Sequence, residues 1–112
     1  MRAEKLNAAQ IQDGLAKLDA WTLDADHHTI EKTWTFDSFP TAMAFFAQAG
    51  ERADRLDHHP EFVSTYIRMR VRLWTHDVNG LTRLDFELAA AFDQLITAEF
   101  STRLKPSEPP CA

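Results

Sequence analysis

The side chains best suited to proton transfer in this sequence are those of three histidines. His58 and His59 stand together before Pro60, and His76 follows a strand-like run, with Asp77 directly after it. Neutral imidazole both accepts and donates a proton, and its unperturbed pKa of about 6.5 lies close to cellular pH. The group favours proton transfer to and from a small molecule, although imidazoles with carboxylates nearby are also compatible with a metal site.

The expected secondary structure brings these histidines together. Asp54 lies four residues before His58, so the two would share a helix face if the last helical turn persists. A hairpin places the start of one strand beside the end of the next, so His76 should return close to His58 and His59. Asp85, which opens the last expected helix, would add a second carboxylate at the same end of the sheet.

Some of these side chains also have purely structural interpretations. An adjacent histidine pair in a loop is more often solvated surface than a site, and we assign no role to the second such pair, His27 and His28. Asp85 is placed to cap a helix, at capping-box spacing from Thr82. Asp54 is placed as a surface charge on a helix.

Periodicity and capping signals predict helices and hairpins in the order α-β-β-α-β-β-α. The expected elements are a helix from Asn7 to about Asp19, strands 20–24 and 30–36, a helix capped by Asp37 or Ser38 that ends before Pro60, strands 61–66 and 68–75, and a helix from Thr82 to about Arg103. Without βαβ alternation, this order predicts an α+β fold with a four-stranded antiparallel sheet and three helices packed on one face.

Hydrophobic spacing predicts which faces are buried. For the long helix we expect a stripe of Phe39, Ala42, Met43, Phe46, Ala49 or Gly50, and Ala53. For the last helix we expect Leu84, Leu88, Ala91, Phe92, Leu95 and Ile96. In strand 68–75 we expect Met69, Val71, Leu73 and Thr75 to share the buried face, and Arg68, Arg70, Arg72, Trp74 and His76 to share the open one. Trp74 could be either an exposed strand residue or a stacking wall.

Length and composition restrict the function. The 112 residues suit one domain, which we place at 1–104, followed by a proline-rich, disordered tail at 105–112. A net charge of −5 argues against a general nucleic-acid binder. No run of about 20 apolar residues could span a membrane, and no secretory signal opens the chain. Cys111 is the one cysteine, which excludes an internal disulfide and favours a reducing cytoplasm.

The stretch from Glu51 to Asp85 resembles the pterin-4a-carbinolamine dehydratases. Its most specific parts are D-x-x-x-H-H-P-E-[aromatic] at 54–62 and T-H-D-x-x-G-L-T-x-x-D at 75–85. Residues 6–21 resemble the family's opening helix and following tryptophan, and 33–46 resemble its second strand and long helix. Phe62 stands where many members have tryptophan, and the turn at 78–80 differs in detail from some relatives.

The resemblance implies the family's α+β fold and its reaction. That reaction removes water from 4a-hydroxytetrahydropterin, left by an aromatic amino acid hydroxylase, to give quinonoid dihydropterin. The pterin is the substrate, and no cofactor or metal is implied. The catalytic positions that match are His58, His59, His76, Asp54 and Asp85. Substrate contacts are implied for the three histidines and for Pro60, Thr75, Asp77 and Val78.

The residues suit this chemistry. Expelling hydroxide from C4a needs a proton delivered to that oxygen, and the new double bond needs the N5 proton removed. One imidazolium acid and one imidazole base suffice, and nearby carboxylates would orient the rings. We hypothesise that His58 or His59 handles the hydroxyl group and that His76 assists at the other proton.

Two other functions compete with this one. A metal hydrolase is disfavoured, because adjacent histidines rarely both face one ion and no HExxH-like spacing is present. A non-enzymatic interaction or dimerisation-cofactor module would use the open sheet face, where Arg68, Arg70 and Arg72 could bind an acidic partner. The resemblance to the dehydratase family also implies a homodimer or homotetramer, since that family commonly assembles through sheet edges and helices.

Overall fold

The computed structural model describes residues 3–105. Its helices are α1 (Ala8–Ala16), α2 (Phe39–Arg55) and α3 (Arg83–Leu95), and its strands are β1 (Thr22–Leu23), β2 (Ile30–Thr35), β3 (Glu61–Thr65) and β4 (Arg68–Leu73). A 3-10 turn, η1 (His76–Val78), follows β4, and a π turn, η2 (Ile96–Phe100), follows α3. The predicted order is confirmed, whereas Cys111 and the rest of 106–112 lie outside the described residues.

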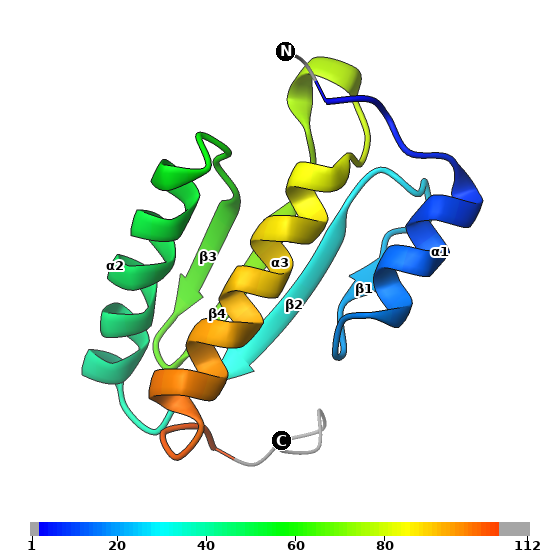
Figure 1. The fold of residues 1–112 in the computed structure, drawn as a ribbon. Coiled ribbons are helices and arrows are strands. Elements are labelled where there is room, and N and C mark those ends of the chain that lie inside the picture. Colours follow the sequence, from blue (N-terminus) through cyan, green and yellow to red (C-terminus); the bar gives the residue numbers. More distant parts are fainter. Residues whose placement is uncertain (1–2, 106–112) are drawn as a thin grey trace.

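The four strands form one antiparallel sheet in the order β1-β2-β4-β3. Strands β2 and β4 lie in the middle and pair from Ile30 with Leu73 to Thr35 with Arg68. Strand β3 pairs with β4 from Glu61 with Arg72 onward. The helices cover one face of the sheet, as expected, with α3 crossing its centre and α2 lying beside β3 (Figure 1).

The helices begin where the sequence predicts, because side chains satisfy their first backbone N–H groups. Asn7 forms a capping box with Gln10 at the start of α1. The hydroxyl of Ser38 accepts from the N–H of Thr41 at the start of α2, and Pro40 lies in that first turn. Thr82 caps α3 in the same way, with Asp85 closing its capping box.

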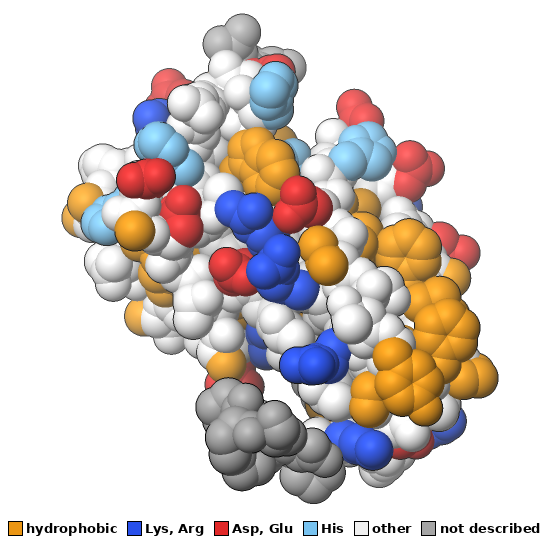
Figure 2. Space-filling model, turned by 180° about the vertical axis from the view of Figure 1, so that it is seen from behind, with side chains coloured by type: hydrophobic (Ala, Val, Ile, Leu, Met, Phe, Trp, Pro, Cys, Tyr) orange, Lys and Arg blue, Asp and Glu red, His pale blue; other side chains and the backbone are white. Residues whose placement is uncertain are grey.

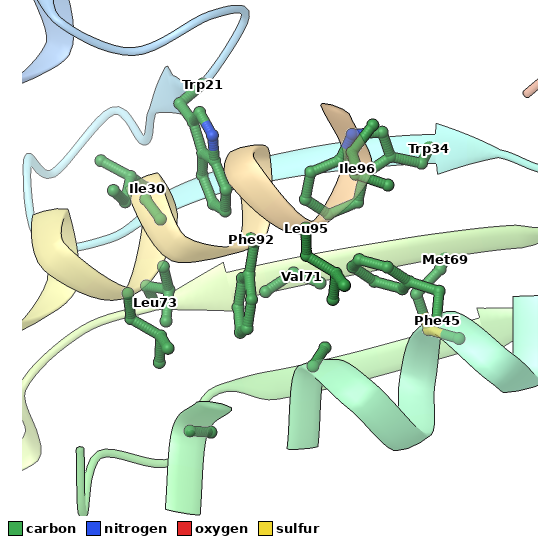
Figure 3. Packing of buried hydrophobic residues seen from close by; sticks show 14 of the residues in the cluster. Trp21, Ile30, Trp34, Phe45, Met69, Val71, Leu73, Phe92, Leu95 and Ile96 are labelled. Carbon is green, nitrogen blue, oxygen red and sulfur yellow. The ribbon is translucent and has the colours of Figure 1, made fainter. Parts of the chain in front are cut away.

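The core lies between the sheet and the helices (Figure 3). Strand β4 contributes Met69, Val71 and Leu73, all fully buried, which confirms the predicted face. Phe45 of α2 is the aromatic centre, with its ring centroid 5.1 Å from that of Trp34 and 5.3 Å from that of Phe36. This packing fixes α2 and the middle of the sheet relative to each other, and with them the loop that follows α2.

Helix α2 buries only part of the predicted stripe, because Ala42, Ala49 and Ala53 are buried as expected but the two phenylalanines of that stripe are not. Phe45 is fully buried, whereas Phe39 and Phe46, expected in the core, are 46% and 44% exposed. One position along a helix is a rotation of about 100°, so aromatic residues at 45 and 46 lie on different faces. Phe46 instead packs edge-on against Phe62 of β3, with centroids 4.9 Å apart. Spacing alone does not show which of two apolar faces meets the core.

Two helices are shorter than predicted. Helix α1 ends at Ala16 and not near Asp19, because its last turn tightens into i to i−3 hydrogen bonds. Helix α3 ends at Leu95, and the wider turn η2 replaces the regular helix expected to about Arg103. The wider turn buries both Ile96 and Phe100.

The last described residues are hydrogen-bonded to the sheet. The N–H of Lys105 donates to the carbonyl of Thr35 at 2.9 Å. Nε of Arg103 donates to Oδ2 of Asp37 at 2.6 Å, which links the segment after η2 to the residue before the N-cap of α2.

This ion pair predicts a pH-dependent contribution to stability. The hydrogen bond from Arg103, followed by one with Thr41, lowers the pKa of Asp37 below its ordinary value of 3.8. A carboxyl group whose pKa is lowered in the folded state stabilises the fold at pH values above its ordinary pKa. That stabilisation is lost as the pH falls through the lowered pKa. The Asp37→Asn variant should therefore be less stable than wild type at neutral pH, and the gap should shrink in acid. Urea unfolding of both proteins at neutral and at acid pH measures this difference in stability. A difference that stays constant would contradict the stabilising role of the ion pair between Asp37 and Arg103.

The open face of the sheet carries the predicted arginines, interspersed with acidic groups (Figure 2). Arg70 lies 3.8 Å from Glu31, and Arg72 lies 3.5 Å from Glu61. These neighbours offset much of the positive charge that an acidic partner would need. Across residues 3–105, none of the helices has the length and apolar character needed to cross a bilayer.

Candidate active site

The end of helix α2 separates the two adjacent histidines. Asp57 has a left-handed backbone with φ 51°. The N–H groups of Asp57 and His58 donate to the carbonyls of Asp54 and Ala53, each at 3.0 Å. This pair of hydrogen bonds is the Schellman motif, which ends a helix and turns the chain away from its axis. His58 is consequently buried, with 8% exposure, whereas the side chain of His59 is 66% exposed.

The expectation that Asp54 shares a helix face with His58 is therefore wrong. An i, i+4 pair needs continuous helix through both positions, and α2 ends at Arg55. Asp54 lies at the surface with an 86% exposed side chain, and its Oδ1 is 3.7 Å from Nε2 of His59. Asp54 therefore lies near His59, and His58 contacts a different carboxylate.

The three histidines border one cavity. The cavity has a volume of about 400 Å³ and is lined by Asp57, His58, His59, Trp74, Thr75, His76 and Asp77. His58 and His59 precede β3, and His76 begins η1 just after β4, so the β3–β4 hairpin brings them to the same end of the sheet. A volume of roughly 300–1,000 Å³ is typical of small-molecule sites.

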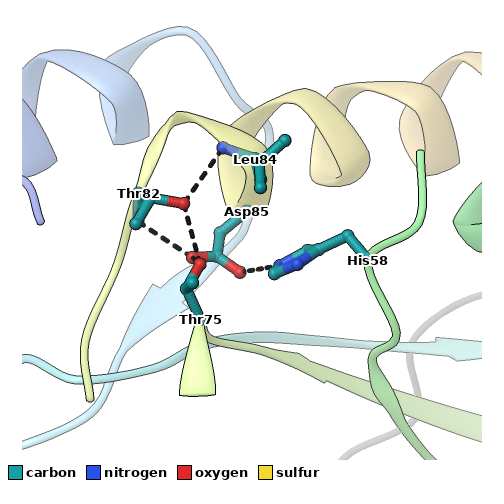
Figure 4. Close-up of polar contacts among 5 residues, drawn as sticks. All are labelled: His58, Thr75, Thr82, Leu84 and Asp85. Atoms are coloured by element: carbon teal, nitrogen blue, oxygen red, sulfur yellow. Dashed lines mark hydrogen bonds and ion pairs between the residues drawn. The ribbon is translucent and has the colours of Figure 1, made fainter. Parts of the chain in front are cut away.

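Asp85 is the carboxylate that supports His58. Its side chain is fully buried, and its Oδ1 lies 2.5 Å from Nε2 of His58 (Figure 4). Its Oδ2 accepts a hydrogen bond from the Thr75 hydroxyl at 2.8 Å and another from the Thr82 N–H at 2.9 Å. Both oxygens thus have partners, as a buried carboxylate requires. Asp85 is at once a helix cap and the partner of His58.

The remaining predicted residues fall into separate groups. His76 and Asp77 are exposed at the rim of the cavity. Thr75 borders the cavity, but its hydroxyl is directed into the buried network behind it. Pro60 and Val78 do not line the cavity, and their contact with a substrate stays a prediction.

Two lining residues had no assigned role in the sequence. Asp57 immediately precedes the histidine pair, has a left-handed backbone and lines the cavity. Trp74 was left open between a surface position and a wall, and it is a half-buried wall. The guanidinium carbon of Arg72 lies 5.9 Å from its ring centroid, within cation–π range.

A second groove runs between α1 and α3. It measures about 460 Å³, and Leu6, Leu18, Phe86 and Ala90 are among the residues that line it. It contains no histidine, and two of its charged groups, Arg83 and Glu87, form an ion pair at 3.1 Å. The chemistry available to the histidine cavity is absent from this groove. In the described part of the chain, no cluster of three or more His, Cys, Asp or Glu side chains could hold a metal ion.

The exposure of Asp54 predicts a small effect on function. Ion pairs between solvent-exposed side chains contribute about 0–1 kcal/mol, which corresponds to at most about fivefold in rate. We expect Asp54→Asn to change kcat and kcat/KM of any reaction in the cavity by less than that factor. Steady-state kinetics of the Asp54→Asn and Asp85→Asn variants compare the effect of the exposed carboxylate with that of the buried one. A loss of tenfold or more in Asp54→Asn would show that Asp54 does more than pair with His59.

Comparison with known proteins agrees with this geometry. Residues 4–95 match the family model described as pterin 4 alpha carbinolamine dehydratase. A curated relative from Rhizobium meliloti (strain 1021), provisionally named a pterin-4-alpha-carbinolamine dehydratase, is 47% identical over 94 residues, which cover 84% of this chain and 90% of the relative. A relative from Sinorhizobium medicae (strain WSM419) with the same provisional name is 43% identical over 105 residues, covering 94% of this chain and all of the relative.

Solved structures give the same result. The structure described as a transcriptional coactivator/pterin dehydratase from Brucella melitensis superposes with a TM-score of 0.79 at 36% identity, covering 82% of this chain and 98% of that one. A pterin dehydratase-like RuBisCO assembly factor of the α-carboxysome superposes with a TM-score of 0.60 at 18% identity, covering 69% and 89%, and shows the fold alone. Together with the family match, these similarities show that the chain belongs to the pterin-4-alpha-carbinolamine dehydratase family.

Proposed function

We propose that this protein dehydrates 4a-hydroxytetrahydropterin to quinonoid dihydropterin and water. The observation that carries the proposal is the position of His58, His59 and His76 around one cavity, with His58 backed by the buried carboxylate of Asp85. Family membership supports a pterin as the substrate. The provisional names of the relatives leave the activity of this chain to be measured.

The reaction needs two proton transfers and no change of oxidation state. The C4a–oxygen bond breaks, and a donated proton lets the hydroxyl group leave as water. The N5–H bond gives up its proton, and its electron pair forms the C4a–N5 double bond. Each transfer is general acid–base catalysis, which contributes roughly 10²- to 10⁴-fold.

The geometry favours different tasks for the histidines. His58 is held by Asp85 and sheltered from solvent, so a proton that it accepts is stabilised by the carboxylate behind it. We assign it the removal of the N5 proton, which revises the sequence-based hypothesis that His58 or His59 handles the hydroxyl group and His76 the other proton. His59 and His76 are exposed at the rim of the cavity, where solvent reaches their rings. We assign one of them the donation of a proton to the departing hydroxyl group.

Stopped-flow spectroscopy on synthetic carbinolamine tests the proposal. The purified protein should accelerate the disappearance of the carbinolamine above the rate in buffer, in proportion to enzyme concentration, with the spectrum of quinonoid dihydropterin as product. Treatment with a chelator should leave the rate unchanged. A rate equal to that in buffer at every enzyme concentration would refute the proposal.

Self-association is also proposed, on the evidence of one surface. Hydrophobic side chains gather along the β3 edge of the molecule (Figure 2). Phe39, Phe46, Val63 and Tyr66 are each at least 36% exposed; the Phe39 ring stacks on that of Tyr66, and Phe46 packs against Phe62 of β3. Apolar patches beside an unpaired strand edge commonly mark protein interfaces. They support the predicted homodimer or homotetramer, whereas a cytoplasmic location stays a prediction from the sequence.

A further inference from the structure

Two buried threonine hydroxyl groups lie behind Asp85. Thr75 is 7% exposed and Thr82 is fully buried. Their hydroxyl oxygens are 2.7 Å apart, and that of Thr75 is also 2.8 Å from Oδ2 of Asp85 (Figure 4). The hydroxyl of Thr75 is thus committed to Asp85 and Thr82. The proposed function so far gives these two groups no task.

The hydrogen atoms of this network can be assigned in order. The Thr82 hydroxyl oxygen accepts from the N–H of Leu84 at 3.2 Å. The single hydrogen of the Thr75 hydroxyl goes to Oδ2 of Asp85. The hydrogen of the Thr82 hydroxyl must then go to the Thr75 oxygen, because Thr75 has none left to donate across their 2.7 Å contact. The chain of donors therefore runs in one direction, from Leu84 to Asp85.

This direction sets the protonation pattern of the histidine. Oδ2 of Asp85 accepts from the Thr75 hydroxyl and the Thr82 N–H, so every donor reaching it suits an ionised carboxylate. Facing an ionised Oδ1 at 2.5 Å, Nε2 of His58 must carry a hydrogen. The tautomer of neutral His58 is thereby fixed, and Nδ1 is left as the atom that accepts a proton.

We propose that Thr75 is a positioning residue, which acts through Asp85 to hold His58 as its Nε2–H tautomer and does not use its hydroxyl to bind substrate. The catalytic part of this inference rests on the proposed function, whereas the tautomer does not. Thr75 orients the carboxylate, and Thr82 orients Thr75. A substrate contact at Thr75, expected from the sequence, would then be made by atoms other than its hydroxyl group.

The kinetic test compares Thr75→Val with Thr75→Ser. Valine keeps the shape of the side chain but removes the donor, so kcat should fall about 10- to 100-fold, as for other residues that orient a functional histidine, while KM stays within about twofold. Serine restores the hydroxyl and should recover most of kcat. Thr41→Val is the matched control, since Thr41 is likewise buried, at 5% exposure, and hydrogen-bonded, but to Ser38 and Arg103. It should keep the kcat of wild type.

The spectroscopic test does not depend on catalytic activity. The ¹⁵N resonances of His58 in the labelled wild-type protein, above the ordinary titration range of histidine, should show hydrogen on Nε2 and a bare Nδ1. In Thr75→Val the two tautomers should mix. Hydrogen on Nδ1 in wild type would overturn the inference, and so would Thr75→Val with the kcat of wild type. An inactive wild type that shows the expected tautomer would refute only the proposed function.

Discussion

Replacing His58 by alanine is expected to lower kcat for dehydration of 4a-hydroxytetrahydropterin by about 10²- to 10⁴-fold, the usual contribution of a positioned acid or base. The reason is its location, since His58 is the one cavity histidine that is both buried and joined to a carboxylate, with Nε2 2.5 Å from Asp85. Stopped-flow single-turnover rates at saturating substrate measure the loss directly.

A matched variant separates catalysis from folding. His28→Ala is the control, because the contact of His28 with Asp24 is made by its backbone N–H and survives the substitution. It should keep the rate of wild type. Circular dichroism should show both variants folded at the assay temperature. A folded His58→Ala protein that dehydrates the carbinolamine as fast as wild type would remove His58 from the mechanism.

Replacing Asp85 by asparagine is expected to reduce kcat by a comparable factor, up to about 10⁴-fold, while the protein stays folded. The asparagine oxygen can still accept from the Thr75 hydroxyl and the Thr82 N–H, so the helix cap persists. Its NH₂ group must then face His58, and a donor there requires Nε2 without hydrogen. The proton-accepting atom would no longer be Nδ1, and base catalysis would be lost.

The corresponding control is Asp93→Asn. Asp93 is a carboxylate with a 22% exposed side chain, and it accepts hydrogen bonds from the indole N–H of Trp21 and the ammonium group of Lys32. It lies outside the histidine cavity. Asp93→Asn should lower the free energy of unfolding without lowering kcat. Equal loss of kcat in the two variants would show that stability, and not the orientation of His58, controls the rate.

The sequence predicted the fold because its local signals agree with one another. Capping residues at Asn7, Ser38 and Thr82 mark the helix starts, and alternation in strand 68–75 separates the buried face from the open one. The prediction of the buried face of α2 was wrong in part, because two apolar patterns overlap in that helix. Phe45 and Phe46 are adjacent, and only tertiary packing against Trp34 and Phe36 decides that Phe45 is the buried one.

The approach of the three histidines was predictable from the sequence, but the carboxylate that each one meets was not. Hairpin geometry brings His76 back toward His58 and His59, so their approach followed from topology. Because of the left-handed turn at Asp57, Asp54 lies near His59 and not near His58. This turn was hard to predict, since aspartate is not the usual residue for that position. The task of Thr75 was hidden for a similar reason, because its hydroxyl is directed away from the cavity that its backbone borders.

The most direct test of the central claim is one set of single-turnover dehydration rates on synthetic carbinolamine, measured for three proteins under identical conditions. These are wild type, the triple variant His58→Ala/His59→Ala/His76→Ala, and the control His27→Ala/His28→Ala. If the cavity histidines move the protons, the triple variant should fall to the rate in buffer and the control should match wild type. A folded triple variant that remains as fast as wild type would contradict the account.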